Sequence, residues 1–233
     1  MERGDNMEHG ASSHIGTHKL AEFAGLTLHM DTLYMTWLAM AITILIAWLA
    51  TRRLSAVPTS KWQNFLELIV VGLIDQVESS VGPRGKVITP LIITLFVFLL
   101  ISNWLGLVPG LTSPTNDINT TLGFALMVIL LAHGIGMVRR GVFGYLKHFI
   151  QPSIFFLPIN IIEEIAKPVT LSFRLFGNIL AGEILIIILG MLVPYVVPTL
   201  WLAFSVFVGI VQSLIFTIMS LSYLSNSLQD EHH

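Results

Sequence analysis

The chain has 233 residues, of which 54% are hydrophobic and 11% are charged, and its mean hydropathy is +0.80. Soluble domains carry about 25% charged residues, so residues 1–233 are predicted to form a single polytopic membrane domain in a lipid bilayer. The net charge of −2 gives no support for a nucleic-acid partner, and the lack of cysteine excludes disulfides, thiolate catalysis and cysteine metal sites.

Residues 1–30 form a polar N-terminal segment that differs from the apolar remainder of the chain. Its histidines lie among glycine, serine and acidic residues: His9, His14, His18 and His29. Such a tract is compatible with metal binding, but its composition favours a leader that is flexible or lies on a surface. The segment lacks the basic-then-apolar pattern of a signal peptide.

Residues 31–150 are predicted to hold the first spans and a surface helix. An apolar run at about 33–50 is long enough to cross ~30 Å of hydrocarbon. At 60–80, apolar residues recur at helical spacing between polar ones, which predicts an amphipathic helix lying on the membrane. Apolar runs at about 88–108 and 121–138 predict the second and third spans.

Residues 151–233 hold two longer apolar stretches, about 157–193 and 199–226, which predict a helical hairpin. At 1.5 Å per residue the first stretch would be ~50 Å long, well beyond the hydrocarbon thickness. It must therefore tilt steeply, or break at Pro168. The predicted fold is an all-α integral membrane protein with five membrane-crossing helices and one amphipathic surface helix.

The basic residues fix the predicted orientation, because cytoplasmic loops are enriched in lysine and arginine. An outside N-terminus and a cytoplasmic C-terminus place the basic residues that flank the spans inside: Arg52, Arg53, Lys61, Arg84, Lys86, Arg139, Arg140 and Lys147. The loops after the second and fourth spans then lie outside, and they contain no lysine or arginine.

Polar residues in the long fourth span form an unusual pattern. At ~100° per residue, one stripe of the helix carries Glu163, Lys167, Thr170, Arg174 and Asn178, while Glu183 lies on the opposite face. Charge at membrane depth costs roughly 2.5–3.5 kcal/mol on insertion scales, so this pattern indicates function.

Arg174 has no evident counter-ion in its own chain. Glu163 lies about 16 Å away along the helix axis, and Glu183 lies about 13 Å away on the wrong face. Because arginine stays protonated, we infer a carboxylate supplied by another membrane subunit. The alternative is that Arg174 snorkels to a lipid headgroup.

An antiparallel hairpin would place Arg174 opposite Gln212 and Glu183 opposite Ser205. Gln212 could orient the guanidinium, or it could form an interhelical hydrogen bond that only holds the hairpin together. A carboxyl group in an apolar wall resists ionisation, which suits a group that takes up and releases protons. Glu183 could instead be bound to a hydroxyl of the last helix.

Three acidic residues lie nearer the membrane surfaces. Glu163 and Glu164 lie toward the inner side, where Glu163 and Lys167 could form an ordinary i, i+4 ion pair. Asp117 lies in the outer loop 111–119. His133 is a lone histidine near the inner end of its span and is interpreted as structural.

Enzyme motifs are absent: the sequence has no HExxH, GxSxG, P-loop or GxGxxG pattern. No metal ligands cluster, so a non-catalytic protein without metal or cofactor is predicted. A self-contained ion channel or secondary transporter is the alternative to a subunit of a larger complex. The lack of an internal inverted repeat and of a counter-ion for Arg174 argues against that alternative.

The segment KPVTLSFRLFGNILAGE closely resembles the most characteristic segment of subunit a of the F-type rotary ATP synthase. PTNDINTT before the third span and GIVQSLIFTIMSLSYLS in the last helix also resemble this family. The resemblance covers essentially the whole chain. It implies a proton-translocating stator that lies against a ring of c subunits, each with a membrane-buried carboxylate, and couples the proton gradient to ATP synthesis.

The resemblance also implies roles for single residues in two aqueous half-channels and in the hairpin at 151–233. Arg174 matches the arginine that separates the half-channels, with Asn178 as its neighbour and Gln212 facing it. Glu183 and Asp117 match the outer channel, and Glu163 and Glu164 match the inner one. Ser205 stands near the position where some members have a histidine partner for the outer acid, so Glu183 must use another partner. The expected setting is a bacterial-type plasma membrane, with the peripheral-stalk subunit b and the remaining ATP synthase subunits as further partners.

Overall fold

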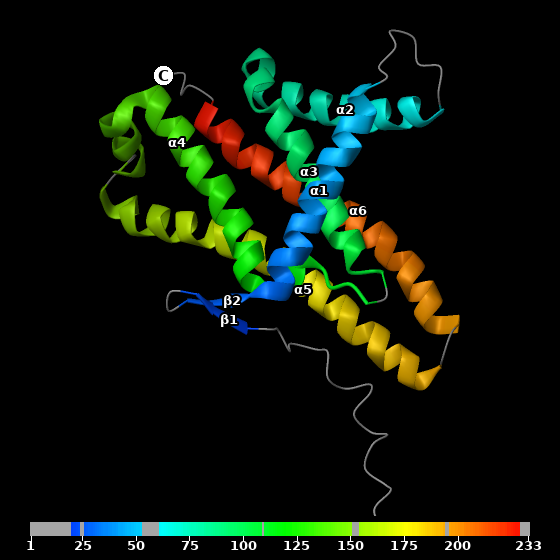
Figure 1. Ribbon diagram of the computed structural model, residues 1–233. Coiled ribbons are helices and arrows are strands. Elements are labelled where there is room, and N and C mark those ends of the chain that lie inside the picture. Colours follow the sequence, from blue (N-terminus) through cyan, green and yellow to red (C-terminus); the bar gives the residue numbers. More distant parts are fainter. Residues whose placement is uncertain are drawn as a thin grey trace, which may run out of the picture.

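The computed structural model describes residues 20–23, 26–52, 61–108, 110–150, 154–193 and 196–228 (Figure 1). Helices dominate these residues, and four of the described helices are long and apolar enough to cross a membrane. This agrees with the predicted helical membrane protein. A fifth apolar helix in the described part, at Thr89–Leu105, is shorter.

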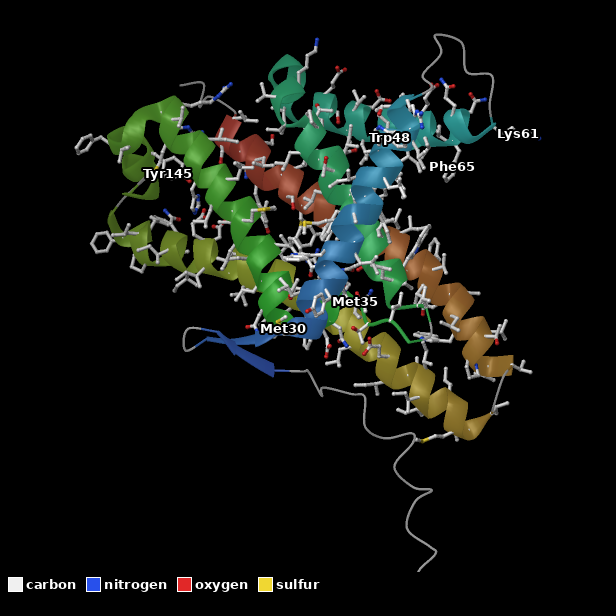
Figure 2. All side chains as sticks on the ribbon, viewed as in Figure 1. Met30, Met35, Trp48, Lys61, Phe65 and Tyr145 are labelled. Atoms are coloured by element: carbon white, nitrogen blue, oxygen red, sulfur yellow. The ribbon has the colours of Figure 1, made fainter. Side chains whose placement is uncertain are left out.

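Helix α1, Met30–Arg52, is the first long apolar helix, and α2, Lys61–Val81, lies across one end of the helical bundle (Figure 1). Figure 2 labels Met30 and Trp48 near the two ends of α1 and places Lys61 and Phe65 of α2 near the Trp48 end. Leu73 and Val77 of α2 are buried, whereas Phe65 is exposed. The amphipathic helix predicted at 60–80 is therefore present.

Helix α3, Thr89–Leu105, begins after a short 3-10 helix at Gly82–Val87 and ends three residues before the predicted limit at 108. Its apolar side chains lie at the centre of the bundle, where Leu99 is fully buried. The same core cluster contains side chains of α1, α4, α5 and α6: Ala39, Ala125, Val128, Leu171, Leu175 and Phe216. This short helix therefore packs the longer ones together.

Helix α4, Ile118–Ile150, is one element with a sharp bend at Gly141. Gly141 has φ 72° and ψ 155°, a region that is essentially restricted to glycine. The bend turns the last part of α4 back toward the rest of the helix (Figure 1). Beside it, Arg139 donates to the carbonyl of Leu228 at 3.2 Å, which ties α4 to the end of α6.

Helices α5, Leu157–Leu192, and α6, Val196–Leu228, have 36 and 33 residues. They contact each other, α5 also packs on α4, and α6 also packs on α3. Trp201 donates to the carbonyl of Gly182 at 3.3 Å near the point where the chain reverses. Helix α5 runs without interruption through Pro168, so the break that the sequence allowed there does not occur.

A β-hairpin precedes α1 and was not predicted from the sequence. Strands β1, Leu20–Phe23, and β2, Leu26–His29, pair antiparallel, with Leu20 opposite His29. The expected all-α fold is therefore wrong for this short segment of the polar leader. Residues 1–19, which hold the other leader histidines, lie outside the described residues.

The two ends of the bundle differ in charge. Arg52, Arg139, Arg140 and the C-terminal end of α6 lie at one end, which we call the basic end. Met30, the loop between α3 and α4, and the C-terminal end of α5 lie toward the other, which we call the loop end (Figures 1 and 2).

Replacing Gly141 by alanine is expected to destabilise the bend of α4 by about 1–3 kcal/mol, because a Cβ strains this backbone conformation. Gly144→Ala is the matched control, since Gly144 is an exposed helical residue without a positive φ. That control is expected to be neutral or stabilising by up to about 1 kcal/mol. Denaturant unfolding of the chain in detergent measures both; equal stabilities would contradict the prediction.

Candidate functional site

Arg174 lies at the centre of α5 and has no ion pair or hydrogen bond within the described part of the chain. The neighbouring residues show on which face of α5 Arg174 lies. Leu171 and Leu175 are buried in the bundle, and Arg174 is half-buried at the edge of the face that they form. On the other side of Arg174, Thr170 and Gly177 are exposed. The guanidinium thus lies where α5 meets its surroundings, not inside the bundle.

The surface of α5 around Arg174 is open. Thr170, Gly177 and Ala181 are exposed, and nothing lies within 4 Å of a Cβ built on Gly177. Small residues of this kind let another helix approach closely in a membrane.

Two polar residues predicted near Arg174 do not contact it through a hydrogen bond. Asn178 is half-buried, one turn along α5. Gln212 of α6 is 6% exposed, and its Nε2 has no hydrogen-bond partner among the described residues. A buried amide without a partner costs about 1–3 kcal/mol, so Gln212 holds an unused donor inside the bundle.

Glu183 has a partner in the structure that the sequence did not reveal. The Nδ2 of Asn116 donates to Oε2 of Glu183 at 2.6 Å, across 67 positions of the chain. Asn116 belongs to a short 3-10 helix, Pro114–Asn116, in the loop between α3 and α4. Ser205, the residue predicted to lie opposite Glu183, is half-buried and has no hydrogen bond to it.

The loop that carries Asn116 is anchored by buried hydrogen bonds. Thr115 donates to Oδ1 of Asn103 on α3 at 3.2 Å, and Asn103 donates in turn to Ser213 of α6 at 3.1 Å. Ser113 donates to the carbonyl of Ser102 at 2.8 Å. These bonds fix the loop to α3 and α6, and the loop then holds the amide of Asn116 against α5.

Asp117 is buried in the same loop. Its Oδ1 accepts from the backbone N–H of Asn119 at 2.9 Å, as expected for an N-cap of α4. Its Oδ2 accepts from the hydroxyl of Thr32 on α1 at 3.5 Å. Asp117 therefore joins α1 to α4 at the loop end, close in sequence to the partner of Glu183.

Glu163 and Glu164 lie together near the basic end. Nζ of Lys167 is 3.3 Å from a carboxylate oxygen of Glu163 and 2.5 Å from one of Glu164. The i, i+4 ion pair that the sequence allowed is thus present, and Glu164 shares the same cation. Oε2 of Glu164 also lies 3.5 Å from Nε2 of His133.

A cavity of about 260 Å³ opens between α4, α5 and α6 beside this group. Its lining includes the acidic pair and Lys167, together with His133, Arg140, Tyr145, Asn160, Tyr223 and Asn226. The described residues therefore form two polar regions, one at each end of α5, with Arg174 between them. The described part of the chain holds no group of three or more residues fit for a metal ion.

Sequence reasoning missed Asn116, His133 and Tyr145 as members of these regions. Asn116 stands in the run PTND, whose polarity indicated a turn but not which residue would reach α5. The hydroxyl of Tyr145 lies 2.7 Å from Nδ1 of His133, and only the bend at Gly141 brings these two residues together.

Comparisons with known proteins give matches over most of the chain. The family model described as ATP synthase A chain matches residues 33–225. The chain belongs to the ATP synthase A chain family. A relative named ATP synthase subunit a, from Desulforamulus reducens, is 42% identical over 220 residues, which cover 90% of this chain and 84% of the relative.

Two further relatives named ATP synthase subunit a match the chain over a similar length and with slightly lower identity. Subunit a of Acidothermus cellulolyticus is 39% identical over 238 residues, covering 94% of this chain and 86% of the relative. The chloroplastic subunit a of Stigeoclonium helveticum is 38% identical over 229 residues, covering 94% and 92%. The family relationship thus includes the loop, α5 and α6, where the polar residues lie.

Proposed function

We propose that the chain is the proton-translocating stator subunit of an F-type ATP synthase, which passes protons to and from the carboxylates of a c-subunit ring. The observation that carries this proposal is the half-buried Arg174, which lacks an anion among the described residues. An arginine stays charged, so a partner must supply the negative charge if the residue is to lie at membrane depth.

The exposed face of α5 suits a ring of helices. Thr170, Gly177 and Ala181 border Arg174 with small side chains, so a partner helix can bring a carboxylate close to the guanidinium. An ionised ring carboxylate is held there by charge attraction, which is strong in a medium of low dielectric constant. Arg174 then blocks direct proton transfer between the two polar regions.

The two polar regions act as half-channels in this proposal. A proton from the outer water binds Glu183, beside Asn116 and Asp117, and moves to a ring carboxylate. After the ring has turned, the proton leaves toward Glu163 and Glu164 and enters the inner water through the basic-end cavity. Asn178 lies one helical turn from Arg174, Gln212 is the residue that the hairpin register predicts opposite it, and Ser205 lies beside the outer path.

The membrane position follows from the lengths and charges of the helices. Helices α1, α3, α4, α5 and α6 would cross the bilayer, with α2 on the inner surface at the basic end. Because α5 would be about 54 Å long, it must tilt steeply in the hairpin with α6. In this proposal the N-terminus lies outside and the C-terminus lies in the cytoplasm of a bacterial-type plasma membrane, because the basic end faces inward.

The chain binds no nucleotide in this proposal and is not an enzyme by itself. Its partners would be the c ring, the peripheral-stalk subunit b and the remaining ATP synthase subunits. These partners carry the chemistry of ATP synthesis, while the chain carries the ion path.

Reconstitution in lipid vesicles tests the proposal against a self-contained channel or transporter. The purified chain alone is expected to give no proton flux above that of empty vesicles, whereas the complex with the small ring proteolipid conducts protons. Co-purification of the chain with that proteolipid is expected as well. Selective flux through the isolated chain would support the channel and reject the stator.

A further inference from the structure

The basic-end cavity contains titratable groups from each of the three helices around it. Helix α4 contributes His133, Arg140 and Tyr145, helix α6 contributes Tyr223, and helix α5 contributes Glu163, Glu164 and Lys167. The volume of about 260 Å³ has room for several water molecules beside these side chains. His133 is the imidazole in this set, a side chain that can both accept and donate a proton at its ring nitrogens.

His133 is engaged at both ring nitrogens. The Tyr145 hydroxyl lies 2.7 Å from Nδ1, and Oε2 of Glu164 lies 3.5 Å from Nε2. The ring of Tyr145 is held in place by Gly136, where an added Cβ would lie 2.5 Å from a ring carbon. The imidazole therefore stands between a fixed hydroxyl and a carboxylate.

This arrangement allows a simple proton cycle. With Nδ1–H donating to the Tyr145 oxygen, the lone pair of Nε2 faces Glu164 and the cavity. Nε2 accepts a proton from hydronium or from the protonated carboxyl of Glu164, forming one N–H bond as one O–H bond breaks. The imidazolium pairs with ionised Glu164 and then returns the proton to water, and no ring rotation is needed.

The charged side chains around His133 nearly balance one another, so they neither hold a proton permanently on the imidazole nor keep it away. Lys167 pairs with both Glu163 and Glu164, and Arg140 also lines the cavity. The two carboxylates and the two cations sum to zero charge when His133 is neutral. Protonation of His133 therefore gives the cavity a net charge of +1. That charge favours release of the proton once the inner water can take it.

We propose that His133 is a proton-transfer residue of the inner exit and that Tyr145 positions its ring; this rests on the proposed function. The residue lies on α4, outside the α5–α6 hairpin to which the sequence assigned the ion path. The inner exit thus uses a third helix, which the bend at Gly141 folds back onto itself.

The test uses the assembled complex in vesicles, with ATP synthesis driven by an imposed gradient and measured against inner pH. A positioned proton-transfer group typically raises a reaction rate by about 10²–10⁴-fold. Because water in the cavity can also transfer protons, His133→Gln is expected to lower the rate of ATP synthesis about tenfold. It is also expected to change the dependence of the synthesis rate on inner pH. Tyr145→Phe is expected to shift that profile with a smaller loss, whereas Tyr34→Phe, at an exposed position of α1 that does not line the cavity, leaves it unchanged.

Chemical rescue separates proton transfer from packing. Free imidazole is expected to restore synthesis in His133→Ala, because the enlarged cavity admits the missing ring. A normal rate and inner-pH profile in His133→Gln would overturn the inference, and so would a fully assembled His133→Ala complex that imidazole fails to restore. Arg174→Ala in the same vesicles separates the two ideas, because coupled synthesis in that variant would reject the proposed function itself.

Discussion

Arg174→Ala is expected to abolish proton-driven ATP synthesis, with a loss of at least about 100-fold, while the complex still assembles. The magnitude follows from removing a preorganised charge from a site of low dielectric constant. Assembly is expected to persist because Arg174 makes no ion pair or hydrogen bond with the described residues of its own chain. Synthesis by vesicles that contain the variant complex measures the effect.

Arg52→Gln is the matched control for that variant. Arg52 is exposed at the end of α1, with its guanidinium 4.5 Å from the centre of the Trp48 ring, and no ion-path role is assigned to it. We expect wild-type synthesis in this control. Coupled synthesis at a normal rate in Arg174→Ala would remove the basis of the stator proposal.

Glu183→Gln is expected to lower proton-driven synthesis by roughly tenfold or more, because it removes the group that we propose accepts protons in the outer path. Glu67→Gln is the control, since Glu67 lies on α2 and accepts from Gln63 at 2.7 Å. Measurement of synthesis against outer pH reports the step. An unchanged rate in Glu183→Gln at every outer pH would exclude this residue from the path.

Asn116→Leu tests the same step without removing the carboxyl group. Asn116 donates to Glu183, so the substitution removes this hydrogen bond from the carboxylate while the carboxyl group itself stays. The dependence of synthesis on outer pH is therefore expected to differ from that of the wild type. Thr112→Val, at an exposed position of the same loop, is expected to leave the profile unchanged.

The helical elements could be predicted because their signal is local. Apolar runs long enough to cross a bilayer identified α1, α3, α4, α5 and α6, and helical periodicity identified α2. The lack of an anion for Arg174 was also predictable, because it depends on residue type and spacing along one helix. The β-hairpin was not predicted, since its strands are short and lie in a polar segment.

The pairings at the two ends of α5 could not be predicted, because they join distant segments. Asn116 and Glu183 meet only because buried hydrogen bonds of Ser113 and Thr115 fix the loop. His133 read as a lone structural histidine because its partners lie on a bent helix and on α5. Gly141 looks like any glycine in an apolar run, and its positive φ is decided by the packing around it.

The anchoring of the loop between α3 and α4 has a mechanical consequence. Asn103 alone bonds to Thr115, Ser213 and the carbonyl of Gly209, so the loop cannot swing open without breaking several buried contacts. The proposed outer entrance is thus lined by a rigid loop and not by a loop that opens and closes. In the proposed function, the timing of proton entry would then come from the rotating ring, and this chain would set only the positions at which protons are exchanged.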